Sequence, residues 1–369
     1  MDRGAPSRRG PCRDVHADLP GARARHRAVR ARLVSRPAVH VIGEALIDVV
    51  VRADGVERVR PGGSPANVAV GLARLGVPAD LLCRIGADAY GDLLRAHLEQ
   101  AGVGLPDGGS PAPARTSTAV ATLGADGSAS YRFDIDWDPG TLAVPTARIL
   151  HTGSLATVLE PGATAVAAAL SAAGPATLVS VDPNVRPTVG VPQVEVRSRT
   201  ERLAGRAHLL KMSDEDLDWL YPGAAPEEVA ARMHELGVRL FVVTLGAQGC
   251  FLSTSEWSCR IPAEAATLVD TIGAGDAFMS GLLYAVIADD GDQTVRTGVL
   301  QREQVENWAH TAQRSAALTL GRDGAEPPLL AELHARELVS QSAGEAVNSR
   351  RPSSRPVRPE GSSLTGAEL

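Results

Sequence analysis

Short apolar runs alternate with helical patterns through most of this chain, and no other feature of the sequence restricts the fold as strongly. The first run, residues 39–51, predicts one buried strand, and the segment after it repeats Val68, Leu72 and Leu75 at helical spacing before it stops at Gly76. Further apolar runs lie at residues 81–82, 149–150, 178–181, 209–210 and 240–243, and further helical patterns at 90–100 and 163–173. This repeated order predicts an α/β fold with a doubly wound, mainly parallel sheet flanked by helices.

Two other segments, 49–60 and 116–135, show the period-two alternation of half-buried strands. They predict a small antiparallel β-sheet beside the main one, with a turn at residues 125–127. This sheet is either an ordinary edge hairpin or a lid over the carboxyl ends of the parallel strands, where such folds bind ligands, and the pattern does not decide between them. A small sheet with one apolar face often pairs with its copy, so we also predict a homodimer through it.

The two ends of the chain differ in composition from the segment between them. Residues 1–36 hold ten Arg and three Asp, residues 340–369 are rich in Ser, Pro and Arg, and both segments are predicted to be disordered. For the first segment, a non-functional extension is favoured over a targeting sequence or a nucleic-acid-binding arm. The single domain predicted between them, residues 37–339, has a net charge of −14, and so acidic a domain is a poor partner for nucleic acid.

The composition excludes several further classes of protein. No apolar stretch approaches the roughly 18 residues that a membrane span needs, and no secretion signal follows the N-terminus. The four cysteines are spaced 71, 167 and 9 apart, which fits neither a zinc site nor a disulfide framework. We therefore expect a cytoplasmic protein with no membrane partner. Lys211, the only lysine, lies between Leu210 and Met212, which excludes the Gly-Lys-Ser/Thr motif of a P-loop.

The segment 270–278, Asp-Thr-Ile-Gly-Ala-Gly-Asp-Ala-Phe, precedes an apolar helical pattern at 279–287. Small residues directly before a helix let backbone N–H groups approach an anion, and the helix N-terminus adds partial positive charge, so this segment is a candidate phosphate site. Phe278 stands where a dinucleotide fingerprint needs its third glycine, which disfavours a Rossmann-type oxidoreductase. Asp276 would repel a phosphate unless it has a task, such as accepting a proton from a nucleophilic hydroxyl; alternatively it caps the helix.

Residues 61–67, Pro-Gly-Gly-Ser-Pro-Ala-Asn, form a second glycine-rich turn before a helical pattern. The backbone N–H groups of this turn and the amide of Asn67 suit the hydroxyls of a polyol. A nucleophile elbow at Ser64 is disfavoured because Ala66 stands where that motif needs glycine. Asp48, at the end of the first apolar run, either accepts two sugar hydroxyls or is a structural hydrogen-bond acceptor.

Polar groups also follow three other predicted strands, in segments 181–186, 211–216 and 243–249. Each of these signals is weak alone, and an acidic cluster such as 214–216 is usually a helix cap with carboxylates in the first turn. All three segments nevertheless fall at the carboxyl ends of predicted strands, where a doubly wound sheet has its binding site.

Taken in order, these motifs resemble those of the PfkB, or ribokinase-like, family of carbohydrate kinases. The resemblance spans residues 38–335 and rests on Gly-Gly-Ser-Pro-Ala-Asn-Val-Ala at 62–69 and on the segment 270–278, with 85–92 and 319–325 as further similar segments. It implies an enzyme that transfers the γ-phosphate of ATP to a sugar hydroxyl with the help of Mg²⁺, and it makes K⁺ a further candidate cofactor.

The resemblance also implies roles for individual residues. Asp276 matches the base that deprotonates the sugar hydroxyl, and Gly273, Ala274 and Gly275 match the anion hole for the transferring phosphoryl group. The matching sugar-binding positions are Asp48, Gly62, Gly63, Asn67 and Arg186, and the matching nucleotide-binding positions are Lys211, Ser213, Asp216, Thr244, Gly246 and Gly249. Asp270 and Ile272, with the loop 322–324, match the monovalent-cation site. Ser213 and Asp216 depart from the pattern, because many members have Asn and Glu there.

The resemblance is less specific about the substrate. Gly-Glu-Ala-Leu-Ile-Asp at 43–48, Ser64 where ribokinases have Lys, and Ser-Asp-Glu-Asp at 213–216 most resemble bacterial fructokinases. Fructose and ATP are therefore the expected small-molecule partners. The sugars 2-keto-3-deoxygluconate, another ketose or ribose stay open, because substrate choice rests on pocket shapes that no motif encodes. A non-catalytic sugar or nucleotide sensor on the same fold is the remaining alternative.

Overall fold

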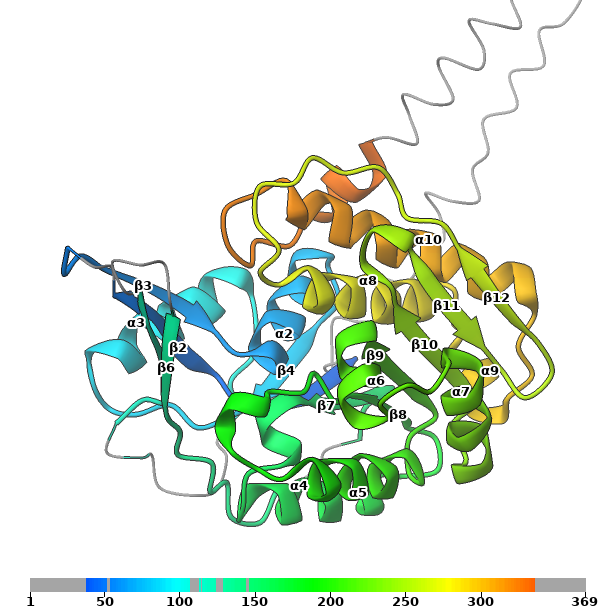
Figure 1. Cartoon of the computed structure of the whole chain (residues 1–369), viewed down its shortest axis with the longest axis horizontal. Coiled ribbons are helices and arrows are strands. Elements are labelled where there is room, and N and C mark those ends of the chain that lie inside the picture. The colour runs from blue at the N-terminus through cyan, green and yellow to red at the C-terminus, as the bar shows by residue number, and fades with distance from the viewer. Residues whose placement is uncertain are drawn as a thin grey trace, which may run out of the picture.

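The computed structural model describes residues 38–51, 54–106, 113, 115–123, 129–143 and 146–335. Its centre is an eight-stranded sheet with the strand order β12-β11-β10-β9-β8-β7-β1-β4 (Figure 1). The strands are β1 (Val39–Ile42), β4 (Ala79–Leu82), β7 (Ile149–Gly153), β8 (Leu178–Asp182), β9 (Leu209–Ser213), β10 (Leu240–Thr244), β11 (Cys250–Ser253) and β12 (Ser258–Ile261). The six neighbouring strands β4, β1, β7, β8, β9 and β10 pair in parallel, and β11 and β12 add two antiparallel strands at one edge. The predicted mainly parallel sheet is confirmed.

Helices cover both faces of this sheet (Figure 1). One face packs against α2 (Ser64–Arg74), α3 (Ala89–Ala101), α8 (Ala274–Ala288), α9 (Asp292–Thr297) and α10 (Arg302–Leu320), and the other against α4 (Gly162–Ala172), α5 (Gln193–Ala204), α6 (Asp214–Leu220) and α7 (Pro226–Leu236). Alternate strand residues enter opposite cores: Val39 and Val41 join the first, and Leu150 and Val181 join the second. Because both faces of the parallel strands are buried, these strands are mainly apolar at consecutive positions and do not alternate.

A second sheet of four strands projects from the main body and is called the small sheet below (Figure 1). Its order is β3-β2-β5-β6, with β2 (Leu46–Val51), β3 (Glu57–Gly62), β5 (Thr118–Leu123) and β6 (Ala129–Asp134). Antiparallel pairing is confirmed for β2 with β3 and for β5 with β6, but it is wrong for the centre, where β2 and β5 pair in parallel. Between β3 and β5 the chain passes through α2, β4 and α3. The alternation of residues within each strand does not show how strands so far apart in sequence pair.

The apolar run 39–51 forms two strands in different sheets, and the prediction of a single strand is wrong. The chain turns between β1 and β2 at Gly43, where a Cβ would lie 2.3 Å from Cγ of Pro65. The apolar sequence continues past the turn because residues 45–47 are apolar and buried as well. Asp48 consequently lies within β2 of the small sheet and not at the end of a main-sheet strand.

Helices α2 and α8 pack against each other so closely that only a glycine fits at their contact. A Cβ at Gly71 of α2 would lie 2.3 Å from Oγ of Ser280 on α8. Both helices begin directly after a glycine with positive φ, at 100° for Gly63 and 75° for Gly273. This contact brings the two glycine-rich turns identified in the sequence to the same side of the main sheet.

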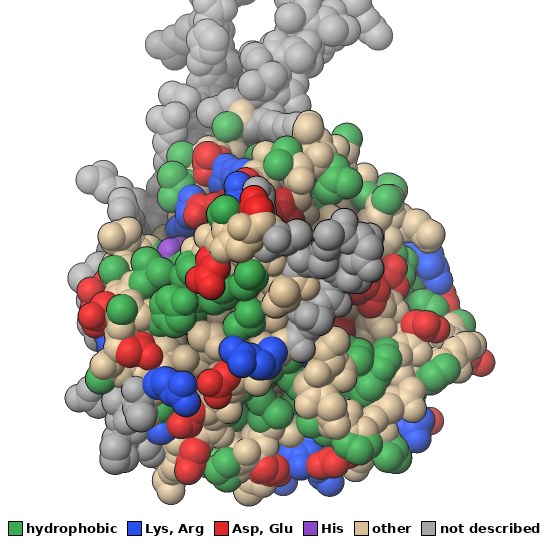
Figure 2. Space-filling view, turned by 60° about the vertical axis from the view of Figure 1, so that its left-hand side comes forward, with side chains coloured by type: hydrophobic (Ala, Val, Ile, Leu, Met, Phe, Trp, Pro, Cys, Tyr) green, Lys and Arg blue, Asp and Glu red, His purple; other side chains and the backbone are tan. Residues whose placement is uncertain are grey.

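The described residues fall within the predicted domain 37–339, and the predicted disordered segments 1–36 and 340–369 lie outside them. So does the predicted turn at 125–127. In the described part of the chain, no helix combines the length and the apolar composition needed to cross a bilayer. On the face shown in Figure 2, the described acidic and basic side chains are interspersed, without one continuous basic field. The predicted homodimer through the small sheet stays a prediction, which light scattering would test.

Candidate active site

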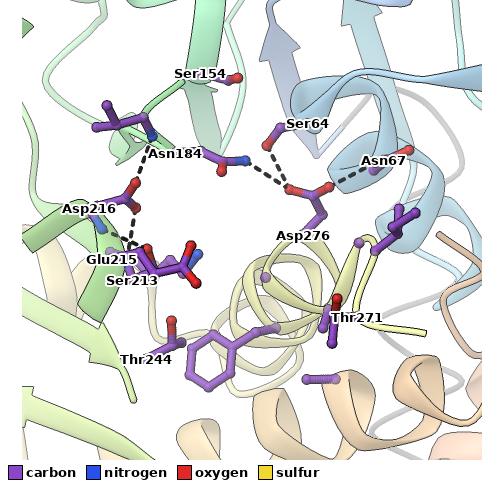
Figure 3. A pocket seen from close by; sticks show the side chains of 18 of the residues that line it. Ser64, Asn67, Ser154, Asn184, Ser213, Glu215, Asp216, Thr244, Thr271 and Asp276 are labelled. Atoms are coloured by element: carbon purple, nitrogen blue, oxygen red, sulfur yellow. Dashed lines mark hydrogen bonds between the residues drawn. The ribbon is translucent and has the colours of Figure 1, made fainter. Parts of the chain in front are cut away.

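A cavity of about 840 Å³ opens where the carboxyl ends of β8, β9 and β10 meet the start of α8, and residues of the small sheet and of the start of α2 close its other side (Figure 3). Nearly all the predicted site residues line it, namely Asp48, Gly63, Asn67, Arg186, Lys211, Ser213, Asp216, Thr244, Gly246, Gly249, Ile272, Gly273, Ala274, Gly275 and Asp276. Gly62 and Asp270 lie outside the lining. The sequence therefore predicted one site from segments that lie far apart along the chain.

Asp276 is the third residue of α8, and three residues from other elements hold its carboxylate (Figure 3). Its Oδ1 accepts hydrogen bonds from Ser64 Oγ at 2.6 Å and from Asn184 Nδ2 at 3.4 Å, and its Oδ2 accepts one from Asn67 Nδ2 at 2.8 Å. The side chain is 6% exposed and lines the cavity. None of these bonds runs to its own helix, so Asp276 is held toward α2 and β8 and does not act as a cap of α8.

Burial raises the pKa of Asp276 above that of an ordinary aspartate. Four neighbours oppose this effect: Ser64 and Asn67 donate hydrogen bonds to the carboxylate, and Lys211 and Arg186 add positive charge near it. A carboxylate whose pKa is raised is a stronger proton acceptor as long as it stays ionised. The environment of Asp276 therefore combines increased basicity with stabilisation of the charged form.

The start of α8 presents backbone donors to the cavity. Gly273 has a φ of 75°, and a Cβ there would lie 2.5 Å from the Cβ of Ala325, so this position needs glycine. Ala274 and Gly275 follow it in the first turn, where N–H groups have no acceptor within the helix, although the N–H of Ala274 donates to the carbonyl of Thr271 at 3.3 Å. These N–H groups and the helix dipole make this end of the cavity suitable for an anion.

The single lysine of the chain is buried beside this helix start. Lys211 Nζ donates to Asp182 Oδ2 at 2.9 Å, and a Cβ at Gly275 would lie 3.2 Å from the same nitrogen. Burial alone would lower the pKa of Lys211, but the carboxylates of Asp182, Asp216 and Asp276 outweigh it and raise the pKa. The ammonium is therefore a fixed positive charge next to the candidate anion site.

The side of the cavity nearest the small sheet carries two carboxyl groups. Asp48 Oδ2 packs against Gly62, where a Cβ would lie 2.0 Å from this oxygen, so Gly62 makes room for Asp48. Burial raises the pKa of Asp48 to about 6, and the charge of Arg186 opposes the rise. Burial also raises the pKa of Glu44 to about 7, and its Oε2 accepts the N–H of Ala156 at 3.1 Å.

Ser213 and Asp216 form a capping box at the start of α6. Ser213 Oγ accepts the N–H of Asp216 at 3.0 Å, and Asp216 Oδ2 accepts the N–H of Ser213 at 2.9 Å. Asp216 Oδ1 accepts the N–H of Val185 at 2.7 Å, which ties α6 to the loop after β8. This geometry supports the helix-cap interpretation that the sequence left open, and binding by these two residues stays a prediction.

The turn after β10 forms the far end of the cavity. Thr244 is the last residue of β10, and its Oγ1 donates to the carbonyl of Met212 at 3.4 Å. Gly249 has a φ of 95°, and a Cβ there would lie 1.9 Å from the carbonyl oxygen of Ile261, so β11 can approach β12 only with glycine here. Gly246, with a φ of 51°, lies in open space.

Asp270 joins two loops just outside the cavity. Its Oδ1 accepts the N–H of Ile272 at 3.0 Å, and its Oδ2 accepts the N–H of Gly324 at 2.9 Å. The residues predicted for the monovalent-cation site are therefore brought together. A carboxylate with nearby backbone carbonyls is a donor set that fits K⁺, and Ile272 can contribute only its carbonyl because its side chain has no donor atom.

No group of three or more His, Cys, Asp or Glu in the described part of the chain could hold a metal ion. Mg²⁺ is usually bound by one or two carboxylates together with substrate phosphates. The acidic side chains of Asp214 and Glu215 line the cavity on the β9 side. The site therefore fits a magnesium ion that arrives with phosphate groups, and it does not fit one held in a protein cage.

Sequence reasoning missed some residues of this cavity. Asn184 lines the cavity and Asp182 lies behind it as the partner of Lys211. Both belong to a polar segment that the sequence did single out, but no local signal showed which side chain faces Asp276 or Lys211. Ser64 was considered as a nucleophile and as a mark of the subfamily, but not as a partner of Asp276, to which its hydroxyl donates. Glu44 lies in the turn at Gly43, which the sequence did not predict, so its position at the cavity could not be foreseen.

Comparison with known proteins identifies the family. The model of the pfkB family carbohydrate kinases matches residues 36–332. The chain belongs to this family. Fructokinase-1 of Oryza sativa subsp. japonica is 31% identical over 320 residues, which cover 81% of this chain and 97% of that relative. The resemblance seen in the two glycine-rich motifs is confirmed.

Two solved structures of bacterial fructokinases share the fold of this pfkB-family chain. A double mutant from Vibrio cholerae O395, with fructose, ADP and potassium bound, has a TM-score of 0.69 and 28% identity and covers 81% of this chain and 97% of its own. A fructokinase from Xylella fastidiosa with bound ATP has a TM-score of 0.68 and 25% identity and covers 83% and 98%. The predicted ribokinase-like architecture, with a large parallel sheet and a small mixed one, is thereby confirmed.

Proposed function

We propose that this pfkB-family kinase transfers the γ-phosphoryl group of ATP to a terminal hydroxyl of a small sugar and that fructose is its preferred acceptor. The observation that carries the proposal is the position of Asp276 in the first turn of α8, where its buried carboxylate accepts hydrogen bonds from Ser64 and Asn67 of α2. A group that accepts a proton from an alcohol thus lies next to a site suited to a phosphate. The fructokinases described above support fructose and ATP as the substrates.

In the proposed reaction, Asp276 accepts the proton of the sugar hydroxyl while the hydroxyl oxygen attacks the γ-phosphorus. The bond between this phosphorus and the oxygen of the leaving ADP breaks, so the products are the sugar phosphate and ADP. The N–H groups of Ala274 and Gly275 donate to the oxygens of the transferring group, and Lys211 adds a fixed positive charge beside it. Positioning and electrostatic stabilisation supply most of the rate, because phosphoryl transfer needs little covalent chemistry from protein.

The sugar would bind between the small sheet and α2. Asp48 accepts sugar hydroxyls, Asn67 both donates and accepts, and Arg186 brings a positive charge to the same side of the cavity. The small sheet acts as a lid that closes over the sugar and excludes water, which would otherwise compete as the phosphoryl acceptor. The nucleotide would occupy the opposite end, along Lys211, Ser213, Asp216, Thr244, Gly246 and Gly249.

Two cations complete the proposal. Asp214 and Glu215 on the cavity wall would help to hold Mg²⁺, which would supply positive charge to offset the charge that develops during phosphoryl transfer. K⁺ would bind at Asp270 and the carbonyl of Ile272, where the carboxylate already links the loop of the anion site to the loop 322–324. Asp270 itself orders this link through two backbone hydrogen bonds.

A substrate panel tests the proposal directly. ADP release is measured with ATP, Mg²⁺ and K⁺ and with fructose, tagatose, ribose, 2-keto-3-deoxygluconate or adenosine, and Asp276→Asn is the matched negative control. Fructose should give the highest kcat/KM, and the variant should give little ADP with any acceptor. A different preferred sugar would overturn the fructose assignment but keep the kinase. Sugar binding by calorimetry without sugar-dependent ADP release would instead identify a non-catalytic sensor.

A further inference from the structure

The shortest hydrogen bond to Asp276 comes from a residue that none of the predicted roles includes. Ser64 is the first residue of α2, is 8% exposed, and donates from Oγ to Asp276 Oδ1 at 2.6 Å across 212 positions of sequence. A buried hydroxyl at this distance from a carboxylate forms a strong, charge-assisted hydrogen bond. Ser64 also lines the cavity, so its hydroxyl lies at the place where the sugar is proposed to react (Figure 3).

The contacts of the carboxylate are divided unequally between its two oxygens. Oδ1 receives Ser64 and Asn184, whereas Oδ2 receives only Asn67 among the described residues. An ionised carboxylate offers about four lone-pair positions, two on each oxygen. Three of them are used by these hydrogen bonds, so one lone pair, on Oδ2, receives no hydrogen bond from the described residues.

From this geometry we propose that Ser64 is a positioning residue for the base: its hydroxyl occupies Oδ1, stabilises the ionised carboxylate and leaves Oδ2 to accept the proton of the sugar. The proposal rests on the function proposed above and adds to it which oxygen is the acceptor and what keeps it available. Ser64 itself loses no proton and forms no bond to the substrate.

The charges around Asp276 come from several elements, and they set the direction of the expected pH effect. Asp48 of β2 and Asp182 of β8 disfavour its ionisation, whereas Arg186 after β8 and Lys211 of β9 favour it. Burial raises the pKa of Asp276, and the hydrogen bond from Ser64 is the largest effect that lowers it. Removal of this bond therefore raises the pKa of the base further, so the base stays protonated up to a higher pH.

The test is the pH dependence of kcat/KM for the best sugar of the panel, because this quantity reports the ionisation of the free enzyme. In Ser64→Ala, the acidic side of the pH profile of kcat/KM, the acid limb, should move to higher pH by about one unit. At pH values above this shifted limb, most of the wild-type kcat/KM should be recovered. The matched control is Ser280→Ala, a buried serine one turn further along α8 whose Oγ donates only to its own helix, at the carbonyl of Ala277, 3.1 Å away. Its acid limb should stay in the wild-type position.

Two further results would overturn the proposal. An acid limb that does not move in Ser64→Ala, with activity lowered equally at every pH, would make Ser64 a structural or proton-relay residue. In the Asp276→Asn background, Ser64→Ala should change the residual turnover less than about twofold, because residues that act as one unit are not additive; an additional large loss would show that Ser64 acts independently of the base. Failure of the proposed function would appear separately, as wild-type protein without sugar-dependent ADP release.

Discussion

The two glycine-rich helix starts of this kinase use the same backbone device for different chemical tasks. Gly63 before α2 and Gly273 before α8 both have positive φ, and at both positions a Cβ would collide with neighbouring atoms. The difference lies in the residues that follow. In α2 the first turn contains Pro65, which has no N–H, and side chains that bond Asp276; in α8 the first turn keeps its N–H groups and supplies Asp276 itself.

This difference shows how one local structure is specialised by its first four residues. A proline in the first turn of α2 removes an N–H donor that an anion would use, which is consistent with the proposed binding of sugar hydroxyls by the side chains there. The first turn of α8 contains no proline and has the small residues Ala274 and Gly275, so it suits a phosphate. Under the proposed function, the contact between the two helices would set the distance between the alcohol and the phosphoryl group, which a reaction between them requires.

The largest effects should come from adding a methyl group at each helix start. Gly273→Ala brings a Cβ within 2.5 Å of the Cβ of Ala325 and should lower kcat by about 10²–10³, the value of an anion-hole donor. Gly63→Ala brings a Cβ within 2.7 Å of the carbonyl oxygen of Glu44 and should chiefly raise the sugar KM, by about tenfold or more. Steady-state kinetics with the sugar and ATP varied separately measure both.

The control for these variants is Gly190→Ala, because Gly190 has a φ of 78° but no neighbouring atom within 4 Å of the place that an added methyl group would take. It should lose about 1 kcal/mol of stability from the left-handed backbone and keep normal kinetics. If Gly273→Ala and Gly63→Ala both changed the same kinetic parameter, the two helix starts would not have the different roles proposed for them.

An intermediate effect is expected where α2 crosses α8. In an open helix, a Gly→Ala change stabilises by about 0.5–1 kcal/mol, but at Gly71 the methyl group would lie 2.3 Å from Oγ of Ser280, so overpacking should destabilise by about 1–3 kcal/mol. Urea unfolding gives the sign, and adding Ser280→Ala should recover part of the loss. A stabilised Gly71→Ala variant would mean that the close crossing does not hold the two helix starts together.

The smallest effect is expected at the surface connection between the same two sides. Arg60 of β3 donates to Asp323 Oδ2 at 2.5 Å and so joins the small sheet to the loop next to Asp270. Asp323 is 63% exposed, so Asp323→Asn should lower the free energy of unfolding by less than about 1 kcal/mol, and the loss should shrink in high salt. A loss that is larger and independent of salt would show that this ion pair, and not the crossing of α2 and α8, joins the two sides.

The sequence predicted those parts of the fold that depend on local pattern. The parallel strands of the main sheet are mainly apolar, and the strands β5 and β6 alternate with period two. Each of these patterns is contained within one short segment of sequence. The break of the run 39–51 and the parallel pairing of β2 with β5 were not predicted. Both depend on contacts between distant segments, such as Gly43 against Pro65, that periodicity does not contain.

The same limit applies to the site. Asp276 and its glycine neighbours were predicted because one short segment combines a helix start, small residues and an unexpected carboxylate. Ser64 and Asn184 were not recognised as partners of this carboxylate, because the bond from Ser64 spans 212 positions of sequence and the one from Asn184 spans 92. Which polar side chains face each other across a cavity is decided by the packing of whole helices and strands.

The most direct test of the account is the turnover of Asp276→Asn in an ADP-release assay with the preferred sugar and saturating ATP. The amide has almost the shape of the carboxylate but cannot accept the proton, so kcat should fall by about 10²–10⁴ while nucleotide binding is retained. A variant with near-normal turnover would contradict the assignment of Asp276 as the base and, with it, the proposed mechanism.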